Sequence, residues 1–221
     1  MIIVCGGLKG GTGKSTVATN LSVMRGLAGY EVLLIDADSH DNANATDFSS
    51  VRDETSQGQK KYTAIRLNGK AVLTDTPALA SKHDDVIIDV GGGDSISQRA
   101  ALTIADIYLV PIFPSSFDVW TLENVNLLIS EVKTINLKLQ VFCFLNRADS
   151  SGSHNEDTRE ILRGYEGMTY LEPPIKNRKA FRNAVTKGLG VVELKPKDTQ
   201  AIEEIKALYL HVFGDDFHSK N

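Results

Sequence analysis

The sequence predicts an α/β fold with a doubly wound, mostly parallel sheet and helices on both faces. Two observations predict it: short β-branched runs alternate with segments of helical periodicity, and most of the runs are continuously apolar. Continuous apolar runs are typical of strands buried on both faces of a parallel sheet. With 221 residues, 42% of them apolar and 24% charged, we expect one folded domain over residues 1–221.

The elements follow in chain order. The candidate strands are Ile2–Cys5, Glu31–Ile35, Val86–Asp89, Ile107–Val110, Val141–Leu145 and a weaker Met168–Leu171. Apolar residues recur at three- and four-residue intervals, as in amphipathic helices, over Ser15–Ala28, Ser95–Ala105, Phe117–Val132 and Thr199–Phe213. The polar region His40–Ser81 is the least regular. We interpret it as an elaboration beside the active site, with a short strand at Tyr62–Leu67.

The cysteines, the lengths of the apolar segments and the first residues of the sequence bear on the cellular compartment. Cys5 and Cys143 both lie in apolar runs, which predicts buried side chains and no disulfide framework. No segment approaches the ~18 apolar residues that span a bilayer, and the first residues lack the basic start of a signal peptide. We therefore expect a soluble, cytoplasmic protein without a membrane role.

The segment Lys9-Gly10-Gly11-Thr12-Gly13-Lys14-Ser15 follows the first strand and opens the first helix. Glycines allow successive backbone N–H groups to point at phosphate oxygens, and the helix N-terminus adds partial positive charge. In such a loop Lys14 reaches the β- and γ-phosphates and the Ser15 hydroxyl ligates Mg²⁺. The alternative, a glycine-rich turn with solvated lysines, is disfavoured by this strand–loop–helix context.

The usual first glycine of a phosphate-binding loop would fall at Leu8, and Lys9 stands before the double glycine instead. The segment resembles the deviant Walker A box of the ParA/MinD superfamily, and the whole chain looks most like small ParA-type partition ATPases without an N-terminal DNA-binding extension. The resemblance implies a P-loop NTPase fold, ATP and Mg²⁺ as cofactors, and hydrolysis of ATP to ADP and phosphate that is slow without a partner. It also implies an ATP-dependent homodimer in which Lys9 reaches the partner's ATP.

Two further motifs match the superfamily. In Asp36-Ala37-Asp38, the resemblance implies that Asp36 holds Mg²⁺ through water and that Asp38 orients or deprotonates the attacking water. Asp89, at the end of a strand, would contact the Mg²⁺ shell. The predicted catalytic residues are thus Lys9, Lys14 and Asp38, and the predicted metal ligands are Ser15, Asp36 and Asp89. Taken alone, two aspartates at a strand end would indicate a capped turn.

The predicted nucleotide-binding residues extend beyond the loop. Asn146 ends another strand and, by resemblance, would bind the adenine edge, because an amide both donates and accepts; a cap of the next turn is the alternative. The complete set is Gly10, Gly11, Thr12, Gly13, Lys14, Ser15, Thr16, Asn146 and Pro174. Ser39-His40 and Gly91-Gly92 depart from the superfamily's usual Pro-Gln and Pro-Pro, which leaves the hydrolysis rate open.

Positive charge is concentrated near the C-terminus. Residues 176–197 carry a net charge of +6 in a chain of −4, so the remainder carries −10. With the family resemblance, this favours binding to DNA without sequence preference; a solvated basic face is the alternative. The predicted DNA-binding residues are Lys176, Arg178, Lys179, Arg182 and Lys187.

These features favour an ATPase switch for plasmid or chromosome partition. It would bind nonspecific DNA in the ATP state, associate with the nucleoid, and be released when a ParB-like partner stimulates hydrolysis. One alternative is ParA-like positioning of a protein cargo. Another is a MinD-like membrane regulator, which the acidic Asp215-Asp216 after the last helix disfavours. An iron–sulfur relative is disfavoured by the two apolar-run cysteines, and ATP binding without hydrolysis stays open.

Overall fold

One sheet organises the chain, and the computed structural model describes residues 1–38, 44–55, 61–114, 116–149, 153–215 and 217–218. The strands are β1 (Ile2–Cys5), β2 (Val32–Asp36), β3 (Thr63–Arg66), β4 (Asp85–Asp89), β5 (Ile107–Ile112), β6 (Gln140–Ala148), β7 (Thr169–Tyr170) and β8 (Ile175–Lys176). The helices are α1 (Lys14–Leu27), α2 (Asn44–Thr55), α3 (Ala71–Ala80), α4 (Ile96–Ile104), α5 (Ser116–Lys133), α6 (Ser153–Arg163), α7 (Lys179–Val185) and α8 (Thr199–Phe213).

The strand order is β3-β2-β4-β1-β5-β6-β7, with β8 pairing with β6, and the strand pairs that the structure describes are parallel. The chain first builds the sheet on one side of β1 and then returns to build the other side. The strand order therefore reverses at β1, and ligands of open α/β sheets bind at such a point, beyond the carboxyl ends of the strands. The predicted fold class is confirmed.

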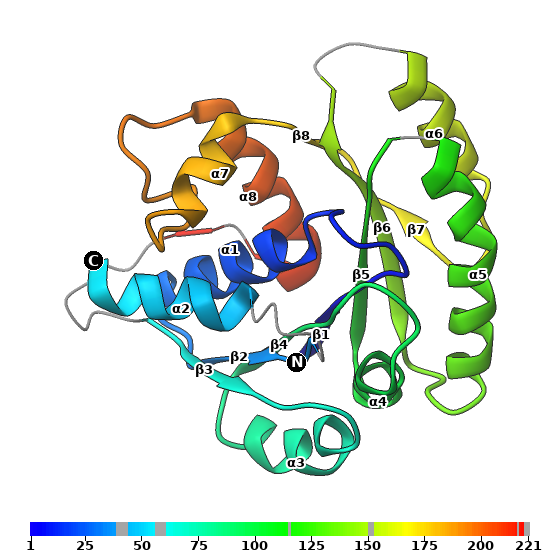
Figure 1. Ribbon diagram of the computed structural model, residues 1–221, viewed down its shortest axis with the longest axis horizontal. Coiled ribbons are helices and arrows are strands. Elements are labelled where there is room, and N and C mark those ends of the chain that lie inside the picture. Colours follow the sequence, from blue (N-terminus) through cyan, green and yellow to red (C-terminus); the bar gives the residue numbers. More distant parts are fainter. Residues whose placement is uncertain (39–43, 56–60, 115, 150–152, 216, 219–221) are drawn as a thin grey trace.

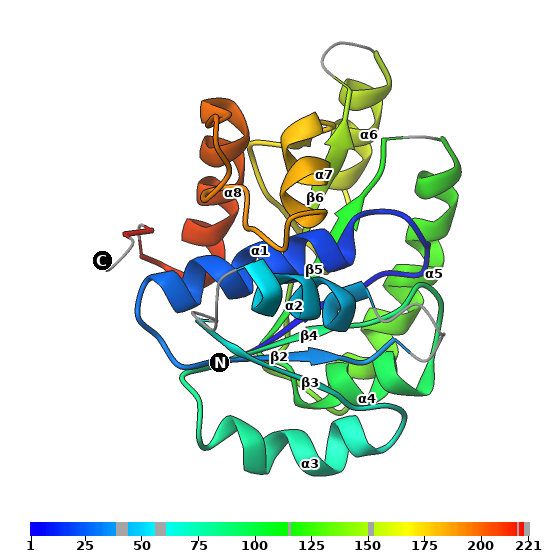
Figure 2. The same cartoon turned by 60° about the vertical axis from the view of Figure 1, so that its left-hand side comes forward.

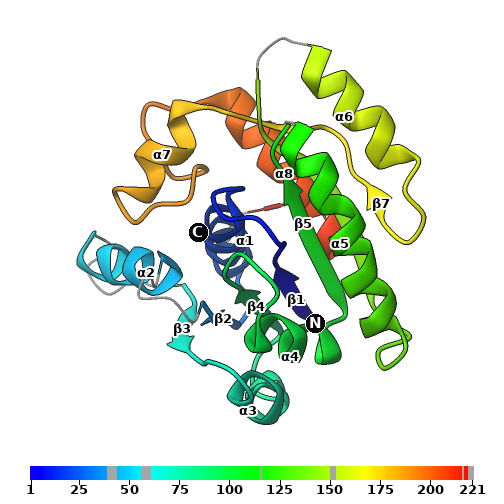
Figure 3. The same cartoon turned by 45° about the vertical axis from the view of Figure 1, so that its right-hand side comes forward.

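Helices cover both faces of the sheet, and each face has its own apolar core (Figure 1). On one face Val17 of α1, Phe48 of α2, Phe181 of α7 and Ile205 of α8 join a single buried cluster. The opposite cluster contains Val72 of α3, Ala101 of α4, Leu122 of α5 and Leu162 of α6. Figure 2 shows α1 and α2 above the sheet with α3 and α4 below it, and in Figure 3 α5 and α6 lie beside each other.

The interpretation of His40–Ser81 as an elaboration of the fold was wrong for its described part, whereas the short strand predicted at Tyr62–Leu67 is confirmed as β3. This region supplies β3, which pairs in parallel with β2 at the edge of the sheet, and the helices α2 and α3 on opposite faces. The helices were missed because their apolar patterns are weak: the face that α2 buries includes Ser49 and Arg52. The weak strand Met168–Leu171 is reduced to the two residues of β7.

Arg52 connects α2 to the loop that follows α7. Its side chain is 2% exposed and forms two hydrogen bonds to the Glu193 carboxylate, of 2.7 and 3.0 Å. It also donates to the Gly188 carbonyl at 3.0 Å, and the Gly190 N–H donates to Glu193 at 2.9 Å. Two segments far apart in the sequence are thus joined by an ion pair whose arginine is buried and whose glutamate is 23% exposed.

We expect Arg52→Ala to lower the free energy of unfolding by about 2 kcal/mol, because it removes a buried side chain with its hydrogen bonds to Glu193 and Gly188, while the partly exposed Glu193 carboxylate can be hydrated. Urea denaturation of the nucleotide-free protein measures this loss. Arg163→Ala is the control. It removes a cation whose side chain is 56% exposed and pairs with Glu172, and it should cost less than about 1 kcal/mol. Equal losses in the two variants would contradict a structural role for this ion pair.

Candidate functional site

The loop between β1 and α1 lies at the point where the strand order reverses. Gly13, directly before α1, has φ 92°, and Lys14 is the first helical residue. The Lys14 ammonium is buried and donates to the Lys9 carbonyl at 2.8 Å. Burial lowers the pKa of Lys14, whereas the charges of Asp89 and Asp38 raise it. The loop thus holds a desolvated cation against its own backbone, where the ammonium group could bind an anion in place of the carbonyl.

Two residues near the end of β6, Asn146 and Arg147, donate hydrogen bonds to carbonyl groups of this loop. The Asn146 amide donates to the Thr12 carbonyl at 2.6 Å, and a Cβ on Gly13 would overlap the Asn146 side chain. Arg147 donates to the Gly11 carbonyl at 2.6 Å and has φ 55°, which is uncommon for a residue with a side chain. Such conformations persist where the surroundings impose them, and they occur often at functional sites. The sequence named Asn146 for the base, but its contact with the loop was not predicted.

Three carboxylates stand beside the loop. Asp36 and Asp89 end neighbouring strands and are paired in register, which places them at the same edge of the sheet. Asp36 accepts hydrogen bonds from the Asp38 N–H at 3.2 Å and from Thr46, at the start of α2, through its N–H at 2.9 Å and its hydroxyl at 3.0 Å. These bonds fix the Asp36 carboxylate and tie α2 to the site.

Asp89 has the environment that a cation site needs. Burial raises the pKa of Asp89 to about 7, a hydrogen bond from the Ser15 hydroxyl lowers it, and the charge of Asp36 raises it again. Its buried Oδ1 has no hydrogen-bond partner among the described residues. Within the described ranges no cluster of three or more His, Cys, Asp or Glu side chains could hold a metal ion unaided. The residues fit Mg²⁺, which is commonly bound by one or two carboxylates together with substrate phosphates.

A glycine-rich loop, Val90–Asp94, follows β4 and packs against the phosphate-binding loop. A Cβ on Gly92 would lie 2.8 Å from the Gly10 nitrogen, and a Cβ on Gly91 would lie 2.5 Å from Asp38 Oδ1. The loop therefore contacts the predicted catalytic aspartate and the predicted phosphate site at once, and a side chain at position 91 or 92 would force these contacts apart. Ser39 and His40, the other departure from the family pattern, lie outside the described residues.

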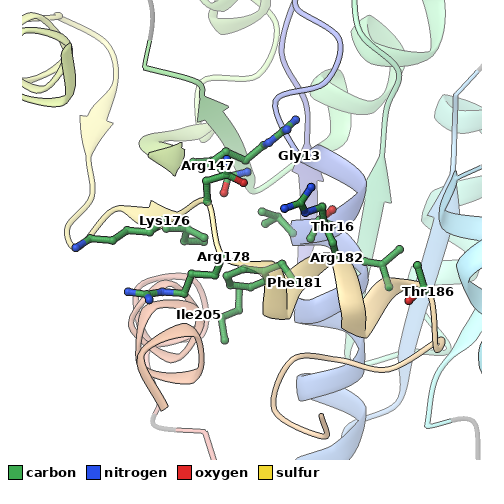
Figure 4. A pocket seen from close by; sticks show the side chains of 14 residues that line it. Gly13, Thr16, Arg147, Lys176, Arg178, Phe181, Arg182, Thr186 and Ile205 are labelled. Atoms are coloured by element: carbon green, nitrogen blue, oxygen red, sulfur yellow. The ribbon is translucent and has the colours of Figure 1, made fainter. Parts of the chain in front are cut away.

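The cleft has two connected parts. The polar part has a volume of about 490 Å³ and is lined by Gly10, Lys14, Ser15 and Asp38. The second part has a volume of about 380 Å³ and is largely apolar (Figure 4). Its wall contains Val17, Ile175, Phe181 and Ile205. Gly13, Thr16, Arg147 and Val185 line both parts. The arrangement suits a ligand with phosphates at one end and a flat apolar group at the other.

The structure brings most of the predicted nucleotide-binding residues to this cleft. Thr12 is buried, and its carbonyl is the group that Asn146 binds. Pro174 is not among the residues that line either part. The segment Ile175–Arg178 after it forms the wall instead.

The five predicted DNA-binding residues divide between different surroundings. Arg178 pairs with Glu204 of α8 at 2.7 Å and lines the apolar part of the cleft. Lys176 and Arg182 line it too, whereas Lys179 and Lys187 are exposed and line a separate groove. The number of charges along the sequence cannot show this division, because it does not indicate which surface each side chain faces.

The two cysteines are buried, as predicted. Cys5 lies in the core on one face of the sheet and Cys143 in the core on the other. Burial raises the pKa of both thiols, that of Cys143 to about 12. Over the described part of the chain, no helix combines the length and apolarity needed to cross a membrane.

The chain is similar to known nucleotide-binding proteins. A sequence profile described as the CobQ/CobB/MinD/ParA nucleotide binding domain matches residues 2–191. The maintenance of carboxysome distribution protein A of Halothiobacillus neapolitanus is 25% identical over 209 residues, covering 91% of each chain.

Two solved structures share the fold. A plasmid partition protein of Borrelia burgdorferi bound to AMPPNP has a TM-score of 0.72 and 20% identity, covering 96% of this chain and 97% of that one. A variant of McdA from Cyanothece in complex with ATP has a TM-score of 0.77 and 16% identity, covering 99% and 98% of the two chains.

Proposed function

Because the chain belongs to the CobQ/CobB/MinD/ParA nucleotide-binding domain family, we propose that it is an ATPase that works as a molecular switch in partition. The cleft binds Mg-ATP, two ATP-bound copies dimerise, and the dimer binds DNA without sequence preference. A ParB-like partner then stimulates hydrolysis, and the protein leaves the DNA. The cargo is a plasmid or a chromosome.

The observation that best supports the ATPase proposal is that the phosphate-binding loop and the carboxylates at the strand ends lie together at one edge of the sheet. Lys14 and the loop N–H groups bind the phosphates, and Ser15, Asp36 and Asp89 hold Mg²⁺, directly or through water. The bound Mg²⁺ neutralises phosphate charge. Asp38, at the polar part of the cleft, orients or deprotonates the attacking water, and Lys9 reaches the ATP of the second copy. Positioning and charge neutralisation supply most of the catalysis in phosphoryl transfer.

Adenine fits the apolar part of the cleft. Asn146 uses one amide hydrogen on the Thr12 carbonyl, which leaves its carbonyl oxygen and its second amide hydrogen available for the base edge. The backbone after Pro174, at Ile175, forms part of the wall. The same amide would therefore hold the phosphate-binding loop and read the base.

A basic groove beside α7 supports the DNA-binding part of the proposal. Four exposed lysines line it, with Asp198 as the one acidic side chain in its wall: Lys179, Lys187, Lys195 and Lys197. The groove has a volume of about 710 Å³ and contains no aromatic side chain on which a base could stack. Lysines without base-reading groups favour contacts to the phosphate backbone, which are independent of sequence.

We expect the protein to bind duplex DNA of arbitrary sequence with ATP and far more weakly with ADP or without nucleotide. The affinity should fall steeply with salt, because phosphate contacts release counterions. The double variant Lys195→Gln/Lys197→Gln should reduce the slope of log affinity against log salt by about two. Fluorescence anisotropy over a salt series with each nucleotide measures both effects. Lys138→Gln, an exposed lysine in the loop before β6, is the control and should keep the slope.

Absence of binding in every nucleotide state, even at low salt, would refute the DNA switch and leave the ATPase proposal standing. Positioning of a protein cargo would then be favoured, because one relative is named for carboxysome distribution. In that case hydrolysis should be stimulated by an adaptor protein attached to the cargo and not by a centromere-binding protein.

A further inference from the structure

Helix α7 separates two hollows of the surface. Phe181, Arg182 and Val185 line the apolar part of the cleft, whereas Lys179 and Asn183 line the basic groove. The helix therefore presents different side chains to the two sides, and each cation on it belongs to one of them. Arg182, which the charge count along the sequence assigned to DNA, lies on the cleft side (Figure 4).

Three arginines line the apolar part of the cleft, and two of them are already held. Arg178 donates to both carboxylate oxygens of Glu204, at 2.7–3.1 Å. Arg147 donates to the Gly11 carbonyl at 2.6 Å, and its guanidinium lies 5.8 Å from the centre of the Phe113 ring. Among the described residues the Arg182 guanidinium takes part in no ion pair or hydrogen bond, and in Figure 4 its side chain extends from α7 towards Thr16.

The position of Arg182 indicates what it would bind. Thr16 and Gly13 line both parts of the cleft, and Arg182 lines the apolar part together with them. A guanidinium that extends towards Thr16 therefore points to the place where the phosphate end of a ligand meets the base end. In a nucleotide this junction is the ribose and the α-phosphate. A planar guanidinium with several N–H donors suits phosphate oxygens, and hydrogen bonds between charged groups are about twice as strong as neutral ones.

We propose that Arg182 is a nucleotide-binding residue that contacts the ribose and α-phosphate, and that it takes no part in binding DNA. The proposal rests on the proposed function for its ligand, a nucleoside di- or triphosphate. It leaves Lys179, Lys187, Lys195 and Lys197 as the cations of the basic groove, since Glu204 neutralises Arg178. One helix thus holds the nucleotide with one face and borders the polyanion groove with the other.

The test compares Arg182→Gln with Lys187→Gln, which removes an equal charge two residues after α7, on the groove side. Isothermal titration with ADP and with ATP, both with Mg²⁺, should give dissociation constants about 10- to 100-fold weaker for Arg182→Gln. The factor should be the same for both nucleotides, because the α-phosphate is common to them. Lys187→Gln should bind both nucleotides as the unaltered protein does, and Arg182→Lys should recover part of the lost affinity.

DNA binding provides the second measurement, at saturating ATP over a salt series. Lys187→Gln should lower the salt slope by about one, and Arg182→Gln should keep it. Melting temperatures of the nucleotide-free variants check folding, and the exposed Arg182 should be replaceable without loss. A variant Arg182→Gln with unchanged nucleotide affinity would overturn the proposal, as would a salt slope reduced like that of Lys187→Gln.

The outcomes also separate this inference from the proposed function. If the unaltered protein binds nucleotide but no DNA, the DNA switch fails while the affinity comparison still decides the role of Arg182. If the unaltered protein binds neither ADP nor ATP, both proposals fall together. A loss of affinity for ATP alone would place the guanidinium at the γ-phosphate and overturn the assignment to the ribose and α-phosphate.

Discussion

Replacing Asp38 by alanine should abolish ATP hydrolysis and leave the ATP-bound dimer intact. The Asp38 N–H is bound to the Asp36 carboxylate, and Gly91 packs directly against the Asp38 side chain. The carboxylate is thus fixed at the polar part of the cleft, where the attacking water would stand. Losing a positioned general base slows a reaction roughly 10²- to 10⁴-fold, and nucleotide binding through the loop is untouched.

Phosphate release in the presence of ATP and DNA measures the rate, and sedimentation with ATP measures the dimer. Asp38→Asn should behave like Asp38→Ala, since it keeps the shape and removes the base. Asp75→Ala, at an exposed position on α3, should hydrolyse ATP normally. Hydrolysis by Asp38→Ala at the unaltered rate would show that another group activates the water. A protein that never hydrolyses ATP, with or without a partner, would contradict the ATPase proposal itself.

Replacing Gly13 by alanine should damage the phosphate-binding loop more than any other single methyl group added there. Position 13 has φ 92°, a conformation that side chains rarely adopt, and the new Cβ would overlap the Asn146 amide that holds the Thr12 carbonyl. Strain of this kind costs about 1–3 kcal/mol. If that cost falls on the loop conformation that binds phosphate, nucleotide affinity drops roughly 5- to 150-fold.

Gly10→Ala is the matched control for stability, because position 10 has open space around it and no positive φ. Thermal unfolding of the nucleotide-free proteins should show a lower melting temperature for Gly13→Ala and an unchanged one for Gly10→Ala. Titration with ATP then measures the affinity of Gly13→Ala. If Gly13→Ala melts and binds ATP like the unaltered protein, Asn146 does not support the loop in the way its hydrogen bond indicates.

The strands β1, β2, β4, β5 and β6 could be predicted because each contains a continuous apolar run, and β1 and α8 have the predicted bounds. Helix α2 could not be predicted, because its buried face includes Arg52. An arginine is expected at the surface unless its ion-pair partner, here Glu193, is known. Helix α3 was missed for a related reason. It contains Pro77 and leaves Leu73 exposed, so neither its composition nor its pattern indicates a helix.

The candidate site could be predicted where its residues lie close together in the sequence. The loop from Lys9 to Ser15 carries its glycines and lysines within seven residues, and Asp36 and Asp89 each end an apolar run. Contacts between distant segments were not predictable, as with Arg147, whose hydrogen bond to Gly11 joins residues 136 positions apart in the sequence. The basic segment shows the same limit, because only the structure shows that Arg178 pairs with Glu204 and that Arg182 lines the cleft and not the groove of the lysines.

The burial of both thiols has a practical consequence for spectroscopy. Cys5 and Cys143 are enclosed in the two cores, and their raised pKa values keep them protonated, whereas thiol-reactive dyes attack the thiolate. A cysteine introduced at the surface would therefore take up the dye almost alone. Ile96, 67% exposed at the start of α4 and two residues after the Val90–Asp94 loop, is a suitable position. A dye on Ile96→Cys would report in real time how that loop responds to nucleotide.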